Sequence, residues 1–571
     1  MEYEYDYEPP VQPRRRKSNA GANFVVLAEE QALKRKLSCT LLNMDMKERY
    51  QSGVESLEDR HQSLGGVMAS LKAAKTFVDV VRIKTIDKLP DKLLIAIFSF
   101  LHHRDLCRVA RVCKKWRTVA YDSRLWSRVS LRPEHSGLNV NNPDMLLPIV
   151  GTRFGTQLRY IELPCDLITS PILHELANKC PNVHYMTLDF SNAMQLHDFN
   201  DLNAFPCNLR TLTVCLSEVI FLEGFMRRVY QSLSSLEVLH LIGTFELGDE
   251  EEEEIYEVIN ISKIKAHTPN LKMVNLYGIS FVDDTHVELL SSNCIHLECL
   301  ALSFCLRVKG STLKVLISRC KKLRTLLMQH CSLEDEHVKA ADWENSRITE
   351  LDLTSTELSE DALSSILLRI HSFTWLGLGH CEFLTDKILL EMSKKGRVNN
   401  LKGLDINYTV GLNENAIFKF IQKHGHQLEG LMVAGKAKLA EQFFLNVIPY
   451  MKNIKMLSIG TANGWFLRMS TKVHIDQIMI CLSQNCPKLE RLEVHWDPDT
   501  LRMSDNSSKF IDQLRMRSPN IKSMTLSDGE YYEMVKSNFE RADRVTVVRT
   551  TTNYVTSITS LLSCYKDLLF N

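Results

Sequence analysis

Two patterns of apolar and polar positions divide the chain. Between about residues 86 and 129, apolar residues recur at helical spacing. One broad stripe after Pro90, where a helix can begin, consists of Leu93, Leu94, Ile97, Phe98 and Leu101. A second run consists of Leu106, Val109, Ala110, Cys113 and Trp116. A helical module of ~45 residues is near the lower limit for burying its own core, so its apolar faces need a partner or the chain that follows.

From Leu158 onward the chain repeats the unit Leu-x-x-Leu-x-Leu, with conservative replacements. The fourteen starts are Leu158, Val183, Leu209, Leu236, Leu271, Leu297, Leu323, Ile348, Phe373, Leu401, Leu428, Ile454, Leu489 and Ile521. Most successive starts are 25–28 residues apart. The second half of a unit is apolar at helical spacing, as at Leu313, Leu316 and Ile317. We expect a fifteenth strand near Val547 and a cap of the open edge between Ser560 and Leu569.

A period of this length with this signature predicts leucine-rich repeats, each made of a strand and a helix. Parallel strands stack ~4.8 Å apart, whereas packed helices need ~8–10 Å. The array must therefore curve, with strands inside and helices outside. The predicted fold is an α/β solenoid, a horseshoe of about 14–15 strand–helix repeats, preceded by a small all-α module. Its concave inner surface is a shape suited to binding proteins.

The helical module resembles the F-box in its ordered dipeptides and its two tryptophans. The matching positions are Leu89-Pro90, Leu93-Leu94, Ile97-Phe98, Leu101, Asp105-Leu106, Val112-Cys113, Trp116 and Leu125-Trp126. The predicted domains are an N-terminal region (1–84), the F-box (85–132) and the repeats with a C-terminal cap (133–571). The resemblance implies that a Skp-type adaptor binds Leu89, Pro90, Leu93, Leu94, Ile97, Phe98, Leu101, Leu106, Val109, Cys113 and Trp116.

In the F-box family, the adaptor links this module to a cullin and a RING subunit in an SCF ubiquitin ligase. The resemblance implies a non-catalytic substrate receptor, whose repeats hold a protein substrate for ubiquitination and degradation. The alternative is a repeat scaffold that acts outside a cullin ligase. A simple observation separates them, namely whether the purified chain needs the adaptor to stay in solution. No nucleophile elbow, Walker loop or metalloprotease helix appears, so we expect no catalytic site.

Three spacings between repeats are long, and insertions in a solenoid form loops that often serve function. One insertion contains Trp465, Phe466 and Arg468, residue types enriched at interface hot spots. These three are candidate substrate contacts; the alternative is that they pack back onto the next repeat. Another insertion carries the acidic run 249–254, which is either a solvated loop or a site for a basic substrate or a cation.

Seven of the sixteen cysteines follow the repeat phase. Four stand three residues before a repeat start, namely Cys180, Cys294, Cys320 and Cys486, and three stand eight residues after one, namely Cys305, Cys331 and Cys381. Single cysteines at one phase predict small buried side chains that satisfy a turn. Metal ligation is the alternative, but the chain has no Cys-x-x-Cys pair. We expect no cofactor and no metal.

Charge and hydropathy limit the partners and the compartment. Positive and negative residues number 69 each in 571, and the strand positions expected to be exposed are mixed, which argues against nucleic acid. Those positions are Arg159, Glu162, Arg210, Glu298, Asp352, Asp405, Glu490 and Glu493. The longest strongly apolar run, 93–101, is too short to span a bilayer. We expect a cytoplasmic or nuclear protein with a disordered start, in which the basic run 14–17 is either a nuclear localisation signal or a solvated tail.

Overall fold

The structure is a computed structural model. It describes residues 89–132, 142–191, 201–216, 223–243, 270–279, 281–435, 441–460, 473–496, 506–526, 529–540 and 546–550, with a few short pieces nearby. The N-terminal region before residue 85, the acidic run 249–254 and the segment 560–569 lie outside the described residues. The candidate substrate contacts Trp465, Phe466 and Arg468 also lie outside them.

A single parallel sheet of 16 strands runs through the repeats, and each strand pairs with the next one along the chain apart from a small insertion. The strands are β1 (Arg128–Ser130), β2 (Tyr160–Pro164), β3 (Tyr185–Asp189), β4 (Thr211–Cys215), β5 (Val238–Ile242), β6 (Met273–Asn275), β7 (Cys299–Ala301), β8 (Thr325–Leu327), β9 (Glu350–Asp352), β10 (Trp375–Gly377), β11 (Gly403–Asp405), β12 (Gly430–Met432), β13 (Met456–Gly460), β15 (Arg491–His495), β17 (Ser523–Leu526) and β18 (Val547–Thr550). The insertion pairs β14 (Val473–His474) with β16 (Leu501–Arg502).

The predicted solenoid is confirmed. Every one of the fourteen repeat starts lies two residues before a strand, from Leu158 before β2 to Ile521 before β17, and the expected fifteenth strand is β18. The sequence did not predict β1, because the segment around Val129 lacks the full repeat signature. This strand pairs in register with β2, with Val129 opposite Ile161, so the sheet begins directly after the helical module.

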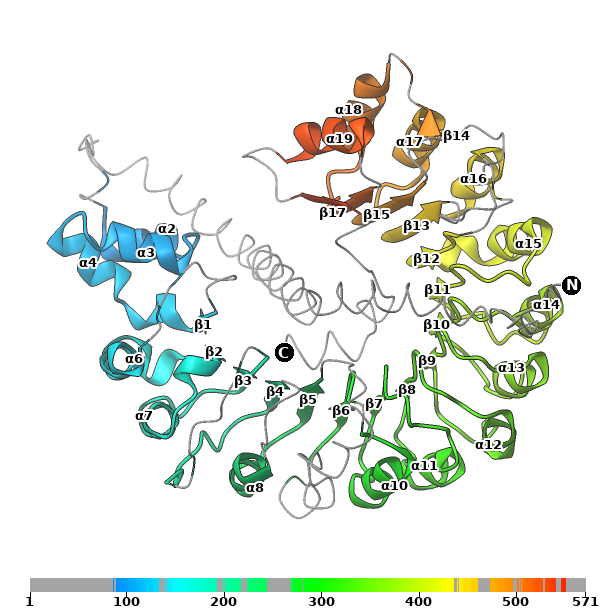
Figure 1. The fold of residues 1–571 in the computed structure, drawn as a ribbon. Helices are drawn as coiled ribbons and strands as arrows, with labels where there is room; N and C mark the ends of the chain where they lie inside the picture. Colours follow the sequence, from blue (N-terminus) through cyan, green and yellow to red (C-terminus); the bar gives the residue numbers. More distant parts are fainter. Residues whose placement is uncertain are drawn as a thin grey trace, which may run out of the picture.

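Helices cover the outer side of the sheet. They are α6 (Pro143–Ile149), α7 (Ser170–Lys179), α8 (Glu223–Ser232), α10 (Asp284–Asn293), α11 (Leu313–Arg319), α12 (Asp335–Ala340), α13 (Glu360–Leu367), α14 (Asp386–Lys394), α15 (Glu414–His424), α16 (Glu441–Val447), α17 (Ile475–Asn485), α18 (Ser507–Arg517) and α19 (Glu530–Phe539). Figure 1 shows the array curving through most of a circle, with strands inside and helices outside. Wide helices joined to narrowly spaced strands produce this curvature.

One continuous core fills the space between sheet and helices. Alternate residues of a strand point to opposite faces, so in β9 Leu351 points outward to the helices while its neighbours Glu350 and Asp352 point to the inner face. From the helical side, α13 contributes Leu363 and Ile366, both fully buried. The same stacking recurs in most of the repeats that the structure describes, and each of these buries its apolar residues against the next.

The cysteines that stand eight residues after a repeat start donate to backbone carbonyl groups of the preceding repeat, as predicted. The thiol of Cys305 donates to the carbonyl of Leu276 at 3.0 Å, and that of Cys331 donates to Leu302 at 3.1 Å. Cys381 makes the equivalent bond 3.2 Å long. Burial raises the pKa of Cys305 and of Cys381 to about 12. These thiols are therefore structural groups of the turn.

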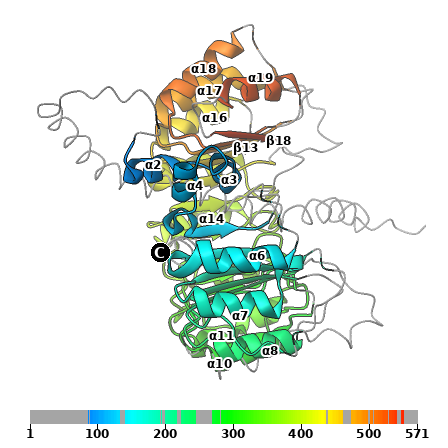
Figure 2. The same ribbon diagram turned by 90° about the vertical axis from the view of Figure 1, so that its left-hand side faces the viewer.

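The N-terminal helical module has three helices and a short 3-10 turn. They are α2 (Asp91–Phe98), α3 (His103–Val109), α4 (Lys114–Ala120) and η2 (Ser123–Trp126). In both overall views α2, α3 and α4 lie beyond α6, at the end of the solenoid (Figures 1 and 2). The module is therefore placed at one end of the array, apart from most of its inner face.

Candidate functional site

The helical module buries a small core of its own. Its members are Leu94, Phe98, Leu106, Ala110, Val119 and Ala120. The Trp116 ring packs edge-on against Phe98, with 5.3 Å between ring centroids. These contacts hold α2 and α3 against α4, so the outer side of α2 is presented as a fixed surface.

The outer side of α2 carries an apolar stripe that no described residue covers. Leu93, Ile97 and Phe100 are 37%, 40% and 62% exposed, and we call these three residues the docking stripe. Leu93 and Ile97 are four residues apart on one face of α2, and Phe100 lies in the turn that follows the helix. A group of exposed apolar residues of this kind is a typical protein-interaction surface. Val112, between α3 and α4, is also 63% exposed.

The eleven residues predicted to bind an adaptor divide into three groups. Pro90, Leu93, Ile97 and Cys113 are exposed, whereas Leu89, Leu101, Val109 and Trp116 are half-buried. Leu94, Phe98 and Leu106 are at most 2% exposed, so they act by holding the module together. The prediction omitted Phe100 and Val112. The signal for Phe100 was present, because the single broad stripe read from the sequence is two stripes, Leu94–Phe98–Leu101 inward and Leu93–Ile97–Phe100 outward.

Polar contacts fix the ends of α2 and α4. The ammonium group of Lys115 donates to the carbonyl of Leu89 at 2.6 Å and lies 3.6 Å from the carboxylate of Asp91. The thiol of Cys113 accepts the backbone N–H of Trp116 at 3.4 Å and thereby caps α4. The start of α2 and the start of α4 are thus tied together beside Pro90.

Aromatic and cationic side chains join the module to the first repeat. Trp126 is 2% exposed; its ring lies 4.8 Å from that of His103 and 6.1 Å from that of Phe154. The guanidinium of Arg153 lies 3.8 Å from the ring centroid of Tyr121. Since Trp126 belongs to the continuous core of the solenoid, the module and the repeats share one packed junction.

Comparisons with known proteins agree with this arrangement. A family model described as F-box-like matches residues 86–132. F-box/LRR-repeat protein 12 of Bos taurus is 29% identical over 143 residues, which cover 24% of this chain and 41% of that protein. The helical module is therefore F-box-like, and parts of the chain are similar to F-box/LRR-repeat proteins. F-box/LRR-repeat protein 4 of Bos taurus is 24% identical over 252 residues, covering 40% of this chain and 39% of the relative. The chain thus spans about two fifths of the length of the curated relatives it matches.

Solved structures overlap only loosely with the whole chain. The crystal structure of the Rad7 and Elc1 complex in yeast covers 88% of this chain and 99% of that chain at 14% identity, with a TM-score of 0.40. An internalin (inlF) from Listeria monocytogenes covers 68% of this chain and 83% of that chain at 12% identity, with a TM-score of 0.28. Scores this low carry no argument about partners. The leucine-rich-repeat fold rests on the strands and helices described above.

The inner face of the repeats differs from the expected exposed surface. Four of the carboxylates expected to be exposed are buried, namely Glu162, Asp352, Asp405 and Glu493, at 0%, 1%, 6% and 3% exposure. A neighbouring strand satisfies Glu162, which accepts from the hydroxyl of Ser130 at 2.7 Å. At the end of β9, Asp352 accepts the backbone N–H of Thr354 at 3.0 Å. Because Asp352 is buried, its pKa is raised, although the hydrogen bonds that it accepts act in the opposite direction.

An apolar cluster also lies on the inner face of the repeats. It consists of Ala301, Leu327, Trp375, Met432 and Met456. Within the described part of the chain, no group of three or more His, Cys, Asp and Glu residues is placed to hold a metal ion. The described helices include none that is both long and apolar enough to cross a membrane.

Proposed function

We propose that this protein is the substrate-recognition subunit of an SCF ubiquitin ligase. Its docking stripe binds a Skp-type adaptor, which connects it to a cullin and a RING subunit, and its repeats bind a protein substrate. The observation that carries the proposal is the exposed stripe of Leu93, Ile97 and Phe100 on a folded F-box. Other subunits perform the transfer of ubiquitin, and this chain promotes degradation by holding the substrate near them.

The stripe suits an apolar partner surface. Fully burying a Leu, Ile or Phe side chain stabilises a complex by about 1.5–3 kcal/mol. Two such residues on α2 and a third in the turn after it support an interface core, because the F-box core already holds α2 in place. The ends of α2 and α4 need no reorganisation when a partner binds.

The packed junction supports the positioning role. A receptor that works by proximity needs a fixed relation between the adaptor side and the substrate side. Trp126 and Arg153 supply that relation. Trp126 of the F-box contacts Phe154 of the first repeat, and Arg153 of the first repeat lies over the rings of Tyr121 and Trp126 in the F-box. A flexible tether would give a lower effective concentration of the substrate at the ligase.

The thiols of the repeats support a non-catalytic role. A nucleophilic cysteine needs a lowered pKa and access to solvent. Burial instead raises the pKa of Cys180 and of Cys486 to about 12, as it does for Cys305 and Cys381. These side chains stay protonated and covered in the folded protein.

The test is a quantitative pull-down from cells with the wild type, Leu93→Ala/Ile97→Ala and Met145→Ala as baits. Met145, on α6, is 61% exposed and serves as a matched apolar control outside the F-box. We expect the wild type and Met145→Ala to bring down adaptor and cullin, and the double variant to bring down neither. If the wild type brings down no cullin, the protein is instead a repeat scaffold acting outside a cullin ligase.

A further inference from the structure

A row of side chains runs along the rim of the solenoid where the strands end. In five consecutive repeats the residue seven positions after the repeat start is left-handed, with φ between 54° and 64°. These residues are Phe304, His330, Ser355, His380 and Tyr408, and we call them the rim row. Because their backbone conformation is shared, the Cα–Cβ bonds of neighbouring repeats are nearly parallel. Neither the docking stripe nor the apolar cluster of the inner face belongs to the rim row.

One backbone hydrogen bond fixes the step between neighbours in the rim row. The N–H of each of its five residues donates to a carbonyl group in the next repeat, as from His330 to Thr354 at 2.9 Å and from Ser355 to Gly379 at 2.8 Å. Ser355 therefore has the same backbone position as the four residues that carry a ring. Only its side chain differs, because a hydroxymethyl group stands where its neighbours have an aromatic group.

The four rings form two stacked pairs, one on each side of Ser355. The rings of Phe304 and His330 are 4.2 Å apart with an interplanar angle of 18°, and those of His380 and Tyr408 are 4.5 Å apart at 16°. His330 and His380 are separated by two steps of the row, or about 9 Å, because strands stack ~4.8 Å apart. A flat ring midway between them would lie about 4.5 Å from each, which is a normal stacking distance. We call this place over Ser355 the ring slot.

The rim beside the ring slot is apolar and exposed. Phe383 and Val410 follow the second stacked pair and are 52% and 80% exposed. Their two loops lie directly against each other, because a Cβ on Gly411 would come within 2.4 Å of the carbonyl oxygen of Leu384. A free aromatic molecule would use the slot alone, whereas a protein chain that inserts an aromatic side chain would also cover this apolar pair.

We propose that the ring slot binds an aromatic side chain of a protein partner. Stacked aromatic rings attract each other beyond the burial of their apolar area. The row itself shows which groups this position accepts, since its other four members are Phe, Tyr and two His. A guanidinium group is also flat, but either histidine would repel it when protonated. Only the choice of a protein as carrier rests on the proposed function, which the inference narrows to substrates that expose an aromatic residue.

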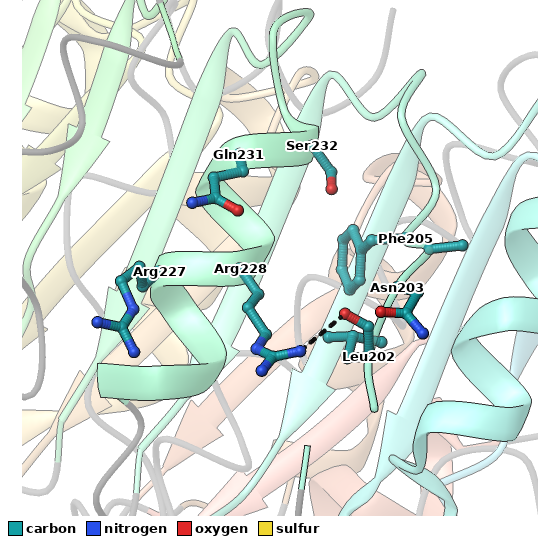
Figure 3. Close-up of a pocket in the computed structure, with 8 residues that line it drawn as sticks. Leu202, Asn203, Phe205, Arg227, Arg228, Gln231 and Ser232 are labelled. Carbon is teal, nitrogen blue, oxygen red and sulfur yellow. Dashed lines mark hydrogen bonds between the residues drawn. The ribbon is translucent and has the colours of Figure 1, made fainter. Parts of the chain in front are cut away.

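A second place that admits an aromatic group is a pocket of about 400 Å³ beside α8. Figure 3 shows Arg228 and Ser232 of this helix facing Leu202 and Phe205 on the segment before β4. The guanidinium of Arg228 donates to the carbonyl of Leu202 at 3.2 Å. Phe205 is the only aromatic residue among the eight that line the pocket, so a ring bound there would stack on one side at most. The pocket therefore supplies a matched control.

The test measures the binding of two blocked amino acids to the purified full chain by saturation-transfer difference NMR. N-acetyl-phenylalanine N-methylamide supplies an aromatic ring, and its cyclohexylalanine analogue supplies a saturated ring of similar size. Ser355→Phe fills the ring slot from within the chain, and the backbone accepts it because Phe304 has φ of 64° at the equivalent position. Ser232→Phe fills the pocket beside α8 with the same substitution, and Ser355→Gly leaves the slot open.

We expect the wild type, Ser232→Phe and Ser355→Gly to bind the phenylalanine probe alike. Ser355→Phe should bind it at least about fivefold more weakly, because two stacking contacts are lost. The wild type should prefer the aromatic probe to the cyclohexyl probe by a similar factor. His380→Ala, which removes one wall of the slot at an exposed residue, should also weaken binding of the aromatic probe. Circular dichroism checks that each variant keeps its fold.

Four results would overturn the proposal. They are no binding by the wild type, equal binding of the two probes, unchanged binding in Ser355→Phe, and unchanged binding in His380→Ala. Loss of binding in Ser232→Phe alone would also reject it, since that result places the ring in the pocket beside α8.

Failure of this proposal is distinguishable from failure of the proposed function. Ser355→Phe should bring down adaptor and cullin as the wild type does, because Ser355 follows β9 and the docking stripe lies on the F-box at the end of the array (Figure 1). Loss of probe binding with retained adaptor therefore refers to the ring slot alone. Binding of the aromatic probe by a wild type that brings down no cullin keeps the slot and rejects the ligase role.

Discussion

At the scale of single residues, the repeats depend on a turn that follows each strand. Seven consecutive repeats place a left-handed residue seven positions after the repeat start, as at His330 with φ of 55° and Ser355 with φ of 57°. Directly after it comes a buried Cys or Thr in the central repeats, such as Cys331. The cysteine phase was predictable from sequence. The left-handed residues were not, because five of the seven are not glycine.

Cys331→Ala tests the structural role of the buried thiols. It removes the bond to the carbonyl of Leu302 and leaves a small cavity, so we expect the free energy of unfolding to fall by about 1–3 kcal/mol. The measurement is denaturant unfolding at neutral pH. Cys207→Ala is the control, since Cys207 is exposed, and it should change stability by less than about 0.5 kcal/mol.

The raised thiol pKa values predict an alkaline limit of stability. A thiol with a pKa of about 12 when folded and about 8.5–9 when unfolded keeps its proton longer in the folded state. The contribution of the protonated thiol to the free energy of unfolding is fully present below pH 9 and is lost as pH rises from 9 toward 12. At pH 8, a thiol reagent should modify Cys113 and Cys207 at once, and Cys305 and Cys381 only on unfolding. Rapid modification of the latter pair would contradict the turn geometry.

Ser355→Gly tests backbone strain in the same turns. A residue other than glycine in the left-handed conformation costs roughly 1–2 kcal/mol of backbone strain. Glycine removes this strain, but it loses more conformational entropy on folding, which offsets part of the gain. We expect a net gain of about 0.5–1 kcal/mol in the free energy of unfolding. Ser364→Gly, inside α13, should instead lose about 0.5–1 kcal/mol. A loss at both sites would show that the turn at Ser355 is not strained.

At the scale of elements, α2 has two apolar faces, one packed inside the F-box and one exposed. The sequence predicted a helix and an apolar stripe correctly. It could not separate the face that packs inside the F-box from the face that is exposed, because both consist of Leu, Ile and Phe at interleaved spacing. That separation depends on where α3 and α4 pack, which is a tertiary fact. For the same reason, carboxylates on the inner face were expected to be exposed and are buried.

Leu93 and Leu94 form a matched pair for this distinction. Leu94→Ala empties part of the F-box core and should lower the free energy of unfolding by about 2–5 kcal/mol. Leu93→Ala trims an exposed side chain and should change it by less than about 0.5 kcal/mol. Chemical denaturation followed by circular dichroism measures both. Similar losses for the two variants would mean that α2 is not oriented as described.

The junction between the F-box and the repeats is an element that the sequence did not reveal. The sequence of β1 lacks the complete repeat signature. Trp126 matched the F-box pattern, and nothing in the sequence indicated that it also packs against the first repeat. Trp126→Ala should cost about 3–5 kcal/mol and separate unfolding of the F-box from that of the repeats. Calorimetry should then show two transitions. A single unchanged transition would indicate that the two parts are not coupled through this residue.

At the scale of the whole molecule, a regular period was sufficient to predict the solenoid. Strand spacing and helix width alone require curvature, so the horseshoe followed from fourteen repeat starts. Departures from regularity, such as the strand β1 that precedes the first full repeat, could be located only in the structure. The curved array and the F-box share one core at Trp126, which gives the inner face of the repeats a defined position relative to the docking stripe.

The most direct test of this account is the equilibrium affinity of the purified chain for a Skp-type adaptor. Leu93 and Ile97 are 37% and 40% exposed in the free chain, so loss of their side chains from an apolar interface should weaken binding at least about tenfold in Leu93→Ala/Ile97→Ala. Circular dichroism should show that the double variant keeps its fold, and Met145→Ala should bind like the wild type. An affinity unchanged by the double substitution would contradict the assignment of the docking stripe.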